Sequence, residues 1–237
     1  MTNDMPRSSE AHGHARVWQN GNPFSDAARM LAPTPITTVF DVGANCGDVA
    51  VHLLANFPAA TVHAFEPNPA PFAHMVERFA DEDRMVGIPA GVSDAPGVAE
   101  LYVYGEDGLS AFSPLSVGSA AHLEGYGTDL VGTIEAELVT LDDYAAVEGI
   151  ETVDLIKLDV QGWEVPCLRG ATRLLSERRV RAVYAEVVFV DLYERQGSFE
   201  EITILLREHG LQLFSLYALS FDESEQLCWA DALYLRR

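Results

Sequence analysis

The sequence predicts an α/β fold in which helices cover both faces of a mostly parallel β-sheet. From residue 38 to the C-terminus, short apolar runs alternate with helical stretches, and the runs are mostly continuous, as in strands buried on both faces. The first two runs each end at or beside an acidic residue, and a glycine-rich turn follows the first. A strand, a tight turn, a helix and a second strand in this order are typical of a nucleoside-binding crevice.

The predicted elements follow one another along the chain. The expected main-sheet strands are apolar or β-branched runs bounded by polar residues: Thr38–Val42, Thr61–Phe65, Val86–Val92, Val153–Val160, Ala182–Val188, Leu211–Leu216 and Leu227–Tyr234. The expected helices lie between them, at Asp48–Asn56, Pro69–Ala80, Glu164–Ser176 and Phe199–His209. Ser198 and Glu201 form a capping box at the start of the last helix.

One interval breaks the alternation. Residues 100–104 and 136–141 have the pattern of two added strands, and a long segment rich in glycine and serine separates them. Such loops are usually functional or mobile, so we expect this one to border the substrate.

Residues 1–35 are predicted to form an N-terminal extension, disordered at residues 1–15. The turn around Pro23 could either cap the site or anchor on the core. Residues 36–237 are predicted to be the domain that carries the site.

Composition narrows the function classes. A chain of 237 residues with 48% hydrophobic and 22% charged residues suits one soluble enzyme domain. Its formal net charge of −21 argues against nucleic acids and anionic membranes as partners, because both require clustered basic residues. The three cysteines lie far apart without a CxxC pair, which fits a reducing compartment. Neither a signal peptide nor a membrane-spanning run is recognisable, so we expect a cytoplasmic protein.

Polar side chains mark the ends of the predicted parallel strands. Open parallel sheets bind ligands beyond the carboxyl ends of their strands, so these side chains are expected to share one site. The acid that ends the second strand can accept hydrogen bonds from both ribose hydroxyls, which favours an adenosine-type cofactor. The strand-end residues are Asp41, Glu66, Ser93, Asp94, Asp159 and Glu186.

Lys157 is the only lysine of the chain and stands inside an apolar strand. Side chains two residues apart on a strand share a face, so Lys157 and Asp159 should point the same way. An unpaired buried charge is expensive, so Lys157 requires a partner, for which Asp159 and Glu186 are the candidates. Its role could be a structural ion pair, or it could set the charge and orientation of Asp159.

Six motifs follow one another along the chain: Asp41-Val42-Gly43-Ala44-Asn45-Cys46-Gly47, Phe65-Glu66-Pro67-Asn68-Pro69, Val92-Ser93-Asp94, Val139-Thr140-Leu141-Asp142-Asp143-Tyr144, Ile156-Lys157-Leu158-Asp159-Val160-Gln161-Gly162-Trp163-Glu164 and Ala185-Glu186-Val187. Each motif alone is common, but their order and spacing are specific. Taken together, they resemble the FkbM-type S-adenosylmethionine-dependent methyltransferases over residues 39–186.

The resemblance implies a Rossmann-like class I methyltransferase fold with seven strands, the last of them antiparallel, and S-adenosyl-L-methionine as cofactor. Glu66 would hold the ribose and Asn68 would lie near the adenine, whose edge Ser93 and Asp94 would border. The residues from Gly43 to Gly47 would pass around the methionine part, and Asp159 would face the methyl group. The implied cofactor-binding residues are Asp41, Gly43, Ala44, Asn45, Gly47, Glu66, Pro67, Asn68, Ser93, Asp94 and Asp159.

The implied reaction is O-methylation of a hydroxyl on a sugar, a polyketide or a related small metabolite. Asp159 is the first candidate for the general base, Glu186 the second and His122 the third, and Lys157 would act beside Asp159. Gln161 stands where the family pattern usually has Glu, and an amide cannot serve as a base. No metal is expected.

Two alternatives stay open. A non-catalytic, methyltransferase-like binding domain would explain Gln161. A nicotinamide-dependent oxidoreductase is disfavoured because positions 43, 45 and 48 are Gly, Asn and Asp, and an acid at the start of the helix would repel a pyrophosphate. The expected partner is a small hydroxylated acceptor, and the apolar C-terminal strand could join a homodimer.

Overall fold

The structure is a computed structural model that describes residues 16–18, 20–105, 109–119, 122–123 and 127–237. The predicted disordered start at residues 1–15 lies outside these residues. The helices are α1 (Pro23–Leu31), α2 (Asp48–Asn56), α3 (Pro69–Arg78), α4 (Leu141–Val147), α5 (Glu164–Arg169), α6 (Thr172–Ser176) and α7 (Phe199–Glu208). The strands are β1 (Arg16–Trp18), β2 (Thr38–Val42), β3 (Thr61–Phe65), β4 (Met85–Ile88), β5 (Gly91–Val92), β6 (Gly97–Tyr104), β7 (Leu109–Ala111), β8 (Leu130–Val139), β9 (Val153–Leu158), β10 (Val180–Val188), β11 (Leu211–Phe221) and β12 (Leu227–Arg236).

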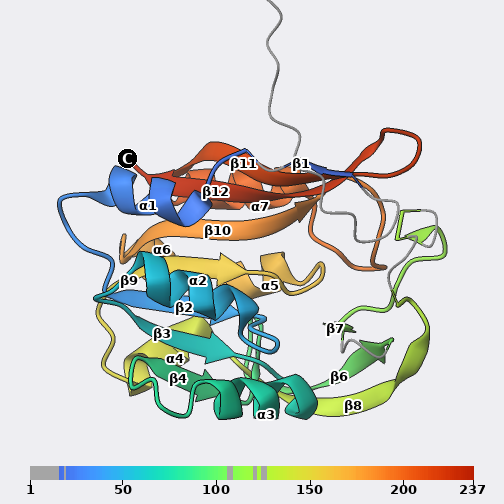
Figure 1. The fold of residues 1–237 in the computed structure, drawn as a ribbon, viewed down its shortest axis with the longest axis horizontal. Helices are drawn as coiled ribbons and strands as arrows, with labels where there is room; N and C mark the ends of the chain where they lie inside the picture. Colours follow the sequence, from blue (N-terminus) through green and yellow to red (C-terminus); the bar gives the residue numbers. More distant parts are fainter. Residues whose placement is uncertain (1–15, 19, 106–108, 120–121, 124–126) are drawn as a thin grey trace, which may run out of the picture.

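The main sheet has the strand order β1-β11-β12-β10-β9-β2-β3-β4 (Figure 1). Strands β10, β9, β2, β3 and β4 are parallel, whereas β12 runs antiparallel to both of its neighbours. This is the predicted Rossmann-like class I methyltransferase sheet of seven strands, with the last strand antiparallel. The short strand β1 adds to its edge, pairing antiparallel with β11.

Helices cover both faces of the main sheet because its strands are apolar on both sides. Val39, Leu155 and Ala182 pack with α1 and α2 in one buried cluster. Their neighbours along the strands point to the opposite face, where Phe40 and Ile156 pack with α4 to α7 in another cluster. This arrangement confirms the prediction that the sheet is buried on both faces.

None of the described helices is long and apolar enough to cross a bilayer.

Three predicted elements are corrected. The run 86–92 is two strands, because Pro89 has no amide donor and the chain leaves the main sheet there. The helix 164–176 is split into α5 and α6, because Asp142 accepts hydrogen bonds from the backbone of Arg173 and Leu174 and so begins a new helix. The strand expected to reach residue 141 ends earlier, where the Thr140 side chain caps α4.

The insertion forms a second sheet in the order β5-β8-β6-β7. Strands β6 and β8 are antiparallel partners, which confirms the predicted added pair. In Figure 1 this sheet lies beyond the tips of the main-sheet strands, near the ends of β2 and β3. The turn around Pro23 begins α1, and Phe24 packs edge-on against Phe57 and Tyr184 as an anchor on the core.

Candidate functional site

A pocket opens at the carboxyl ends of β2, β3 and β9. It encloses about 620 Å³, part of which is open solvent. Loops of the main sheet form one side, which we call the pocket floor (residues 42–45, 65–67 and 159–161), and the second sheet contributes the outer wall (Leu101, Ser110 and Phe112). The lining residues are Val42, Gly43, Asn45, Phe65, Glu66, Pro67, Ala90, Gly91, Val92, Leu101, Ser110, Phe112, Asp159, Val160 and Gln161.

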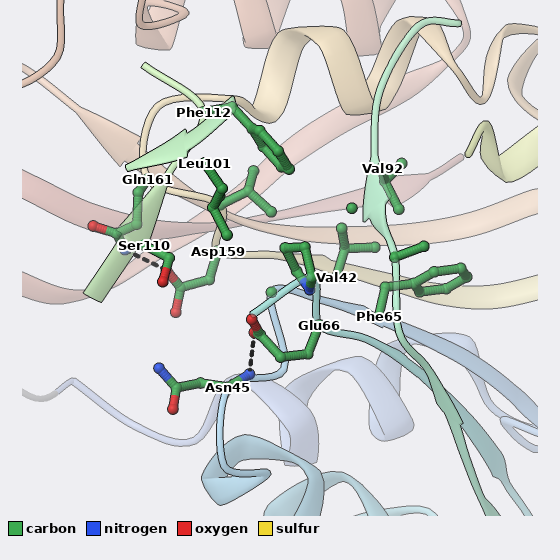
Figure 2. Close-up of a pocket in the computed structure, with 15 residues that line it drawn as sticks. Val42, Asn45, Phe65, Glu66, Val92, Leu101, Ser110, Phe112, Asp159 and Gln161 are labelled. Carbon is green, nitrogen blue, oxygen red and sulfur yellow. Dashed lines mark hydrogen bonds between the residues drawn. The ribbon is translucent and has the colours of Figure 1, made fainter. Parts of the chain in front are cut away.

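Glu66 ties two loops of the pocket floor together. Its Oε2 accepts a hydrogen bond from the backbone N–H of Asn45 at 2.8 Å (Figure 2). Its Oε1 accepts one from the backbone N–H of Asn68, also at 2.8 Å. Burial raises the pKa of the Glu66 carboxyl, and the two backbone donors partly offset this effect. The side chain is 5% exposed and therefore held in one orientation at the pocket. Each oxygen retains capacity to accept a further hydrogen bond.

Gly43 allows the loops after β2 and β9 to touch. Its φ is +77°, and a Cβ atom on it would lie 1.9 Å from the carbonyl oxygen of Asp159. The backbone N–H groups of Gly43 and Ala44 both donate to the carbonyl oxygen of Phe65, at 3.0 Å. The glycine thus lets the loops after β2 and β9 approach each other at the carboxyl edge of the sheet.

A buried ion pair lies directly beneath the pocket floor. Lys157 Nζ is 3.0 Å from Asp41 Oδ1, donates to the Gly43 carbonyl oxygen at 2.8 Å and lies 3.8 Å from Asp159 Oδ2. Burial opposes the charge of Lys157, but Asp41 and Asp159 outweigh it and raise its pKa. The sequence suggested Asp159 or Glu186 as the partner, whereas the closest carboxylate is Asp41, opposite Lys157 in the parallel register.

Asp159 is oriented by a hydrogen-bonded chain. Gln161 Nε2 donates to Asp159 Oδ1 at 2.8 Å (Figure 2). The Tyr193 hydroxyl in turn donates to Gln161 Oε1. Gln161 adopts a positive φ of 55°, which turns its amide back toward Asp159. Gln161 therefore positions the carboxylate instead of acting on a substrate proton. Sequence reasoning missed Tyr193, which is separated from Gln161 by helices α5 and α6 and strand β10.

More carboxyl groups gather behind Asp159. Glu164 is buried and accepts hydrogen bonds from the backbone of Val160 and Gly162, yet burial raises its pKa to about 7. Glu186 is only partly exposed, and burial together with the neighbouring carboxylates raises its pKa well above the ordinary value. Burial also raises the pKa of Asp231, opposite Glu186 on β12, to about 7. These groups can hold protons near neutral pH.

The outer wall contacts residues that follow the floor segments along the chain. Asn68 Nδ2 donates to Ser110 Oγ at 2.9 Å, linking α3 to β7. The Phe112 ring lies 5.9 Å from that of Trp163, tilted by 48°. Leu101 was not singled out in the sequence as a site residue, whereas Ser110 and Phe112 belong to the long glycine- and serine-rich segment that was expected to border the substrate.

Five of the predicted site residues line the pocket: Gly43, Asn45, Glu66, Pro67 and Asp159. Ala44 packs beneath them with Met75, and Gly47 begins α2. Asn68 caps α3 through its side-chain oxygen, so its amide faces Ser110.

The other predicted residues lie around the pocket. Ser93 is buried and accepts a hydrogen bond from the Trp163 ring nitrogen, while Asp94 is exposed. The lining near them comes from residues 90–92. Asp41 and Lys157 form the ion pair below, and Glu186 stands on β10. The third candidate base, His122, is hydrogen-bonded to Asp222 and is not among the lining residues.

Comparison with known proteins decides the family. The FkbM methyltransferase domain matches residues 41–213. The chain belongs to the FkbM methyltransferase family. It is 34% identical over 196 residues to the 31-O-demethyl-FK506 methyltransferase FkbM of Streptomyces tacrolimicus, a match that covers 74% of this chain and 73% of that protein.

A second relative shows a similar degree of identity. The 2-O-methyltransferase NoeI of Sinorhizobium fredii is 33% identical over 181 residues, a match that covers 74% of this chain and 73% of NoeI. Among solved structures, Aeropyrum pernix fibrillarin with bound S-adenosyl-L-methionine is 12% identical and gives a TM-score of 0.48, covering 97% of this chain and 86% of that chain.

Proposed function

We propose that the protein is an S-adenosylmethionine-dependent O-methyltransferase that acts on a hydroxyl of a small molecule such as a sugar or a polyketide. The observation that carries the proposal is a pocket with Glu66 on one side and Asp159 on the other. Glu66 would hold the nucleoside of the cofactor, and Asp159 would stand at the reacting end.

The residues of the pocket fit this cofactor. Glu66 can accept hydrogen bonds from two ribose hydroxyls while its own backbone donors hold it in place. Phe65, Val92 and Phe112 offer apolar surface for a flat base. Asp159 supplies negative charge for a sulfonium, whose positive charge the site must accommodate. S-adenosylmethionine would contribute an activated methyl group, and the protein would contribute its alignment with the acceptor.

The choice of a hydroxyl acceptor is supported by the relatives and by the available base. The two relatives are named as a 31-O-demethyl-FK506 methyltransferase and a 2-O-methyltransferase. A hydroxyl oxygen is a poor nucleophile until its proton begins to leave, and a positioned base contributes about 10²–10⁴-fold to the rate. Asp159 is held by Gln161 and is 41% exposed, so it can accept that proton. Glu186 remains the second candidate.

One of the two arguments against a nicotinamide cofactor becomes weaker in the structure. Asp48, expected to repel a pyrophosphate, is paired with Arg78, so its charge is partly neutralised. Family membership is what favours methyl transfer over hydride transfer. A non-catalytic role drawn from Gln161 is weakened, because Gln161 has its own function in holding Asp159.

The test separates cofactor binding from methyl transfer. Glu66→Ala is expected to weaken S-adenosylmethionine binding strongly, whereas Asp159→Asn should bind within a few-fold of wild type and lose about 10²–10⁴-fold in turnover. Binding is measured by calorimetry, and turnover by transfer of labelled methyl to a panel of hydroxylated acceptors. Glu208→Ala, at an exposed position of α7, is the control. Full turnover by Asp159→Asn at saturating cofactor would refute the assignment of the base.

A further inference from the structure

Outside the pocket, the side chains of His122, Asp222 and Cys228 meet at one point. His122 comes from the insertion, whereas the other two flank the turn between β11 and β12. His122 Nδ1 lies 2.9 Å from Asp222 Oδ2 and 3.8 Å from Cys228 Sγ. Within the described part of the chain, this is where a histidine, a cysteine and a carboxylate bring their ligand atoms within 4.8 Å of one another.

The turn after β11 prepares Asp222 for a ligand. Its Oδ1 accepts hydrogen bonds from the backbone N–H groups of Ser224 and Gln226, at 2.9 and 3.0 Å, and from the Ser224 hydroxyl at 2.7 Å. These three donors occupy one oxygen and fix the carboxylate, so that the other oxygen, Oδ2, turns to His122. Cys228 is fully buried at the start of β12, with Sγ on the same side.

The spacing of the three atoms matches the size of a tetrahedral zinc site. With Zn–N and Zn–O bonds of about 2.0–2.1 Å and a Zn–S bond of about 2.3 Å, tetrahedral angles place N and O about 3.3 Å apart and N and S about 3.6 Å apart. The observed separations of 2.9 and 3.8 Å differ from these by a few tenths of an ångström. We propose that His122, Asp222 and Cys228 bind a zinc ion, with water as the fourth ligand.

The donor set selects the metal. A thiolate and an imidazole disfavour Ca²⁺ and Mg²⁺, which take oxygen ligands, and suit Zn²⁺. Asp222 and the Cys228 thiolate would together neutralise the charge of the ion, and the thiol proton would be released on binding. The net charge of −21 further favours a cation over an anion at this surface.

The position of the site points to a structural role. His122 and Leu123 are adjacent, and Leu123 packs in a buried cluster with Leu192 and Tyr193. Tyr193 in turn donates to Gln161 at the pocket. A metal bound by His122 and the β11–β12 turn would therefore fasten the insertion to the main sheet close to the Tyr193–Gln161–Asp159 chain. The proposal does not depend on the proposed methyl transfer.

The experiment is metal titration of the chelator-treated full chain under reducing conditions. Cobalt(II) serves as a spectroscopic probe, because a Cys ligand gives thiolate-to-cobalt charge-transfer absorption, and calorimetry with zinc gives the stoichiometry. We expect one equivalent of zinc and a charge-transfer band in the wild type. Cys228→Ser should abolish the band, and His122→Ala should weaken zinc binding at least tenfold. Zinc at a hundredfold excess over its Kd should raise the wild-type Tm by roughly 5–10 °C.

Two control variants remove other side chains that could bind the metal. Cys46→Ser removes a different thiol and should keep the band. A His12→Ala, His14→Ala double variant removes the N-terminal His-x-His pair and should leave zinc binding unchanged. Loss of zinc in the double variant, or a band lost with Cys46, would overturn the proposal, as would the absence of zinc binding. Circular dichroism of metal-free Cys228→Ser and Cys228→Ala shows whether the variants are folded, and a folded Cys228→Ser that keeps the band would equally overturn it.

Discussion

The pocket floor and the outer wall are built by different kinds of contact. In the floor, Glu66 accepts two backbone hydrogen bonds, and the Gly43 carbonyl accepts one from Lys157 of the buried ion pair. Asp159 is held by Gln161. The outer wall is linked to residues next to the floor by the Asn68–Ser110 hydrogen bond and by the packing of Phe112 against Trp163. We infer that the floor carries the part of the ligand common to the family, whereas the wall can vary with the acceptor. The difference can be tested by perturbing each region separately.

The largest loss of stability is expected from the ion pair under the floor. Asp41→Asn leaves the buried Lys157 ammonium without its closest carboxylate, which should lower the free energy of unfolding by about 3–5 kcal/mol. Lys157→Met should have a similar effect, but the double variant should lose less than the sum of the two. Urea denaturation measures all three. Strict additivity would show that the two side chains do not stabilise each other.

A methyl group at Gly43 should also damage the floor, because it would collide with the Asp159 carbonyl and require an unfavourable positive φ. We expect Gly43→Ala to lose roughly 2–4 kcal/mol in the free energy of unfolding. The matched control is Gly132→Ala in β8, where a Cβ would meet nothing within 4 Å. Equal stability of the two variants in urea denaturation would contradict the close approach of β2 and β9.

Glu164, which lies next to the floor, should make the free energy of unfolding depend on pH. Burial raises its pKa from 4.5 to about 7, so the folded protein keeps a proton that the unfolded chain releases. The free energy of unfolding should therefore fall as pH rises from 4.5 to about 7 and stay low above that value. The fall attributable to Glu164 is on the order of 3 kcal/mol.

The measurement compares urea denaturation of wild type and Glu164→Gln across this pH range. The amide can still accept hydrogen bonds from Val160 and Gly162, so Glu164→Gln should show a shallower decline. Glu208→Gln, an exposed site, is the control and should follow the wild type. Parallel curves for wild type and Glu164→Gln would contradict the buried, protonated state of Glu164.

The smallest effect is expected from the outer wall. Phe112→Ala removes apolar surface from the pocket and should weaken cofactor binding by about tenfold, with a smaller loss of stability than any floor variant. Calorimetry measures the affinity for the cofactor, and urea denaturation measures the free energy of unfolding. Val98→Ala, at a 67% exposed position of β6, should change neither. A stability loss for Phe112→Ala as large as that for Gly43→Ala would erase the distinction between the two regions.

The sequence predicted the floor well because its signals are local. Strands β2 and β3 and helix α2 have the predicted bounds, and the capping box of α7 is present. The glycine-rich turn and the acid after β3 depend on neighbouring residues, and both line the pocket. Thr140 and Asn22 were local signals too, since each caps a helix that the prediction overlooked.

The remaining features depend on residues far apart in the chain. The split between α5 and α6 depends on Asp142, and the orientation of Asp159 depends on Tyr193. The pairing of Lys157 with Asp41 requires the register of β9 against β2, which a single strand does not reveal. Ser110 and Phe112 lie in the segment that was expected to border the substrate, but Leu101 becomes a pocket residue only when the second sheet folds against the floor.

The central claim is that the floor holds a nucleoside through Glu66, and calorimetric titration tests it most directly. S-adenosylmethionine, S-adenosylhomocysteine and NAD are titrated into wild type, Glu66→Ala and Glu208→Ala. We expect the first two ligands to bind the wild type and the control, and to bind Glu66→Ala at least about 100-fold more weakly, since hydrogen bonds to a charged carboxylate contribute about 1.5–3 kcal/mol each. Binding of NAD alone, or unchanged affinity in Glu66→Ala, would contradict the claim.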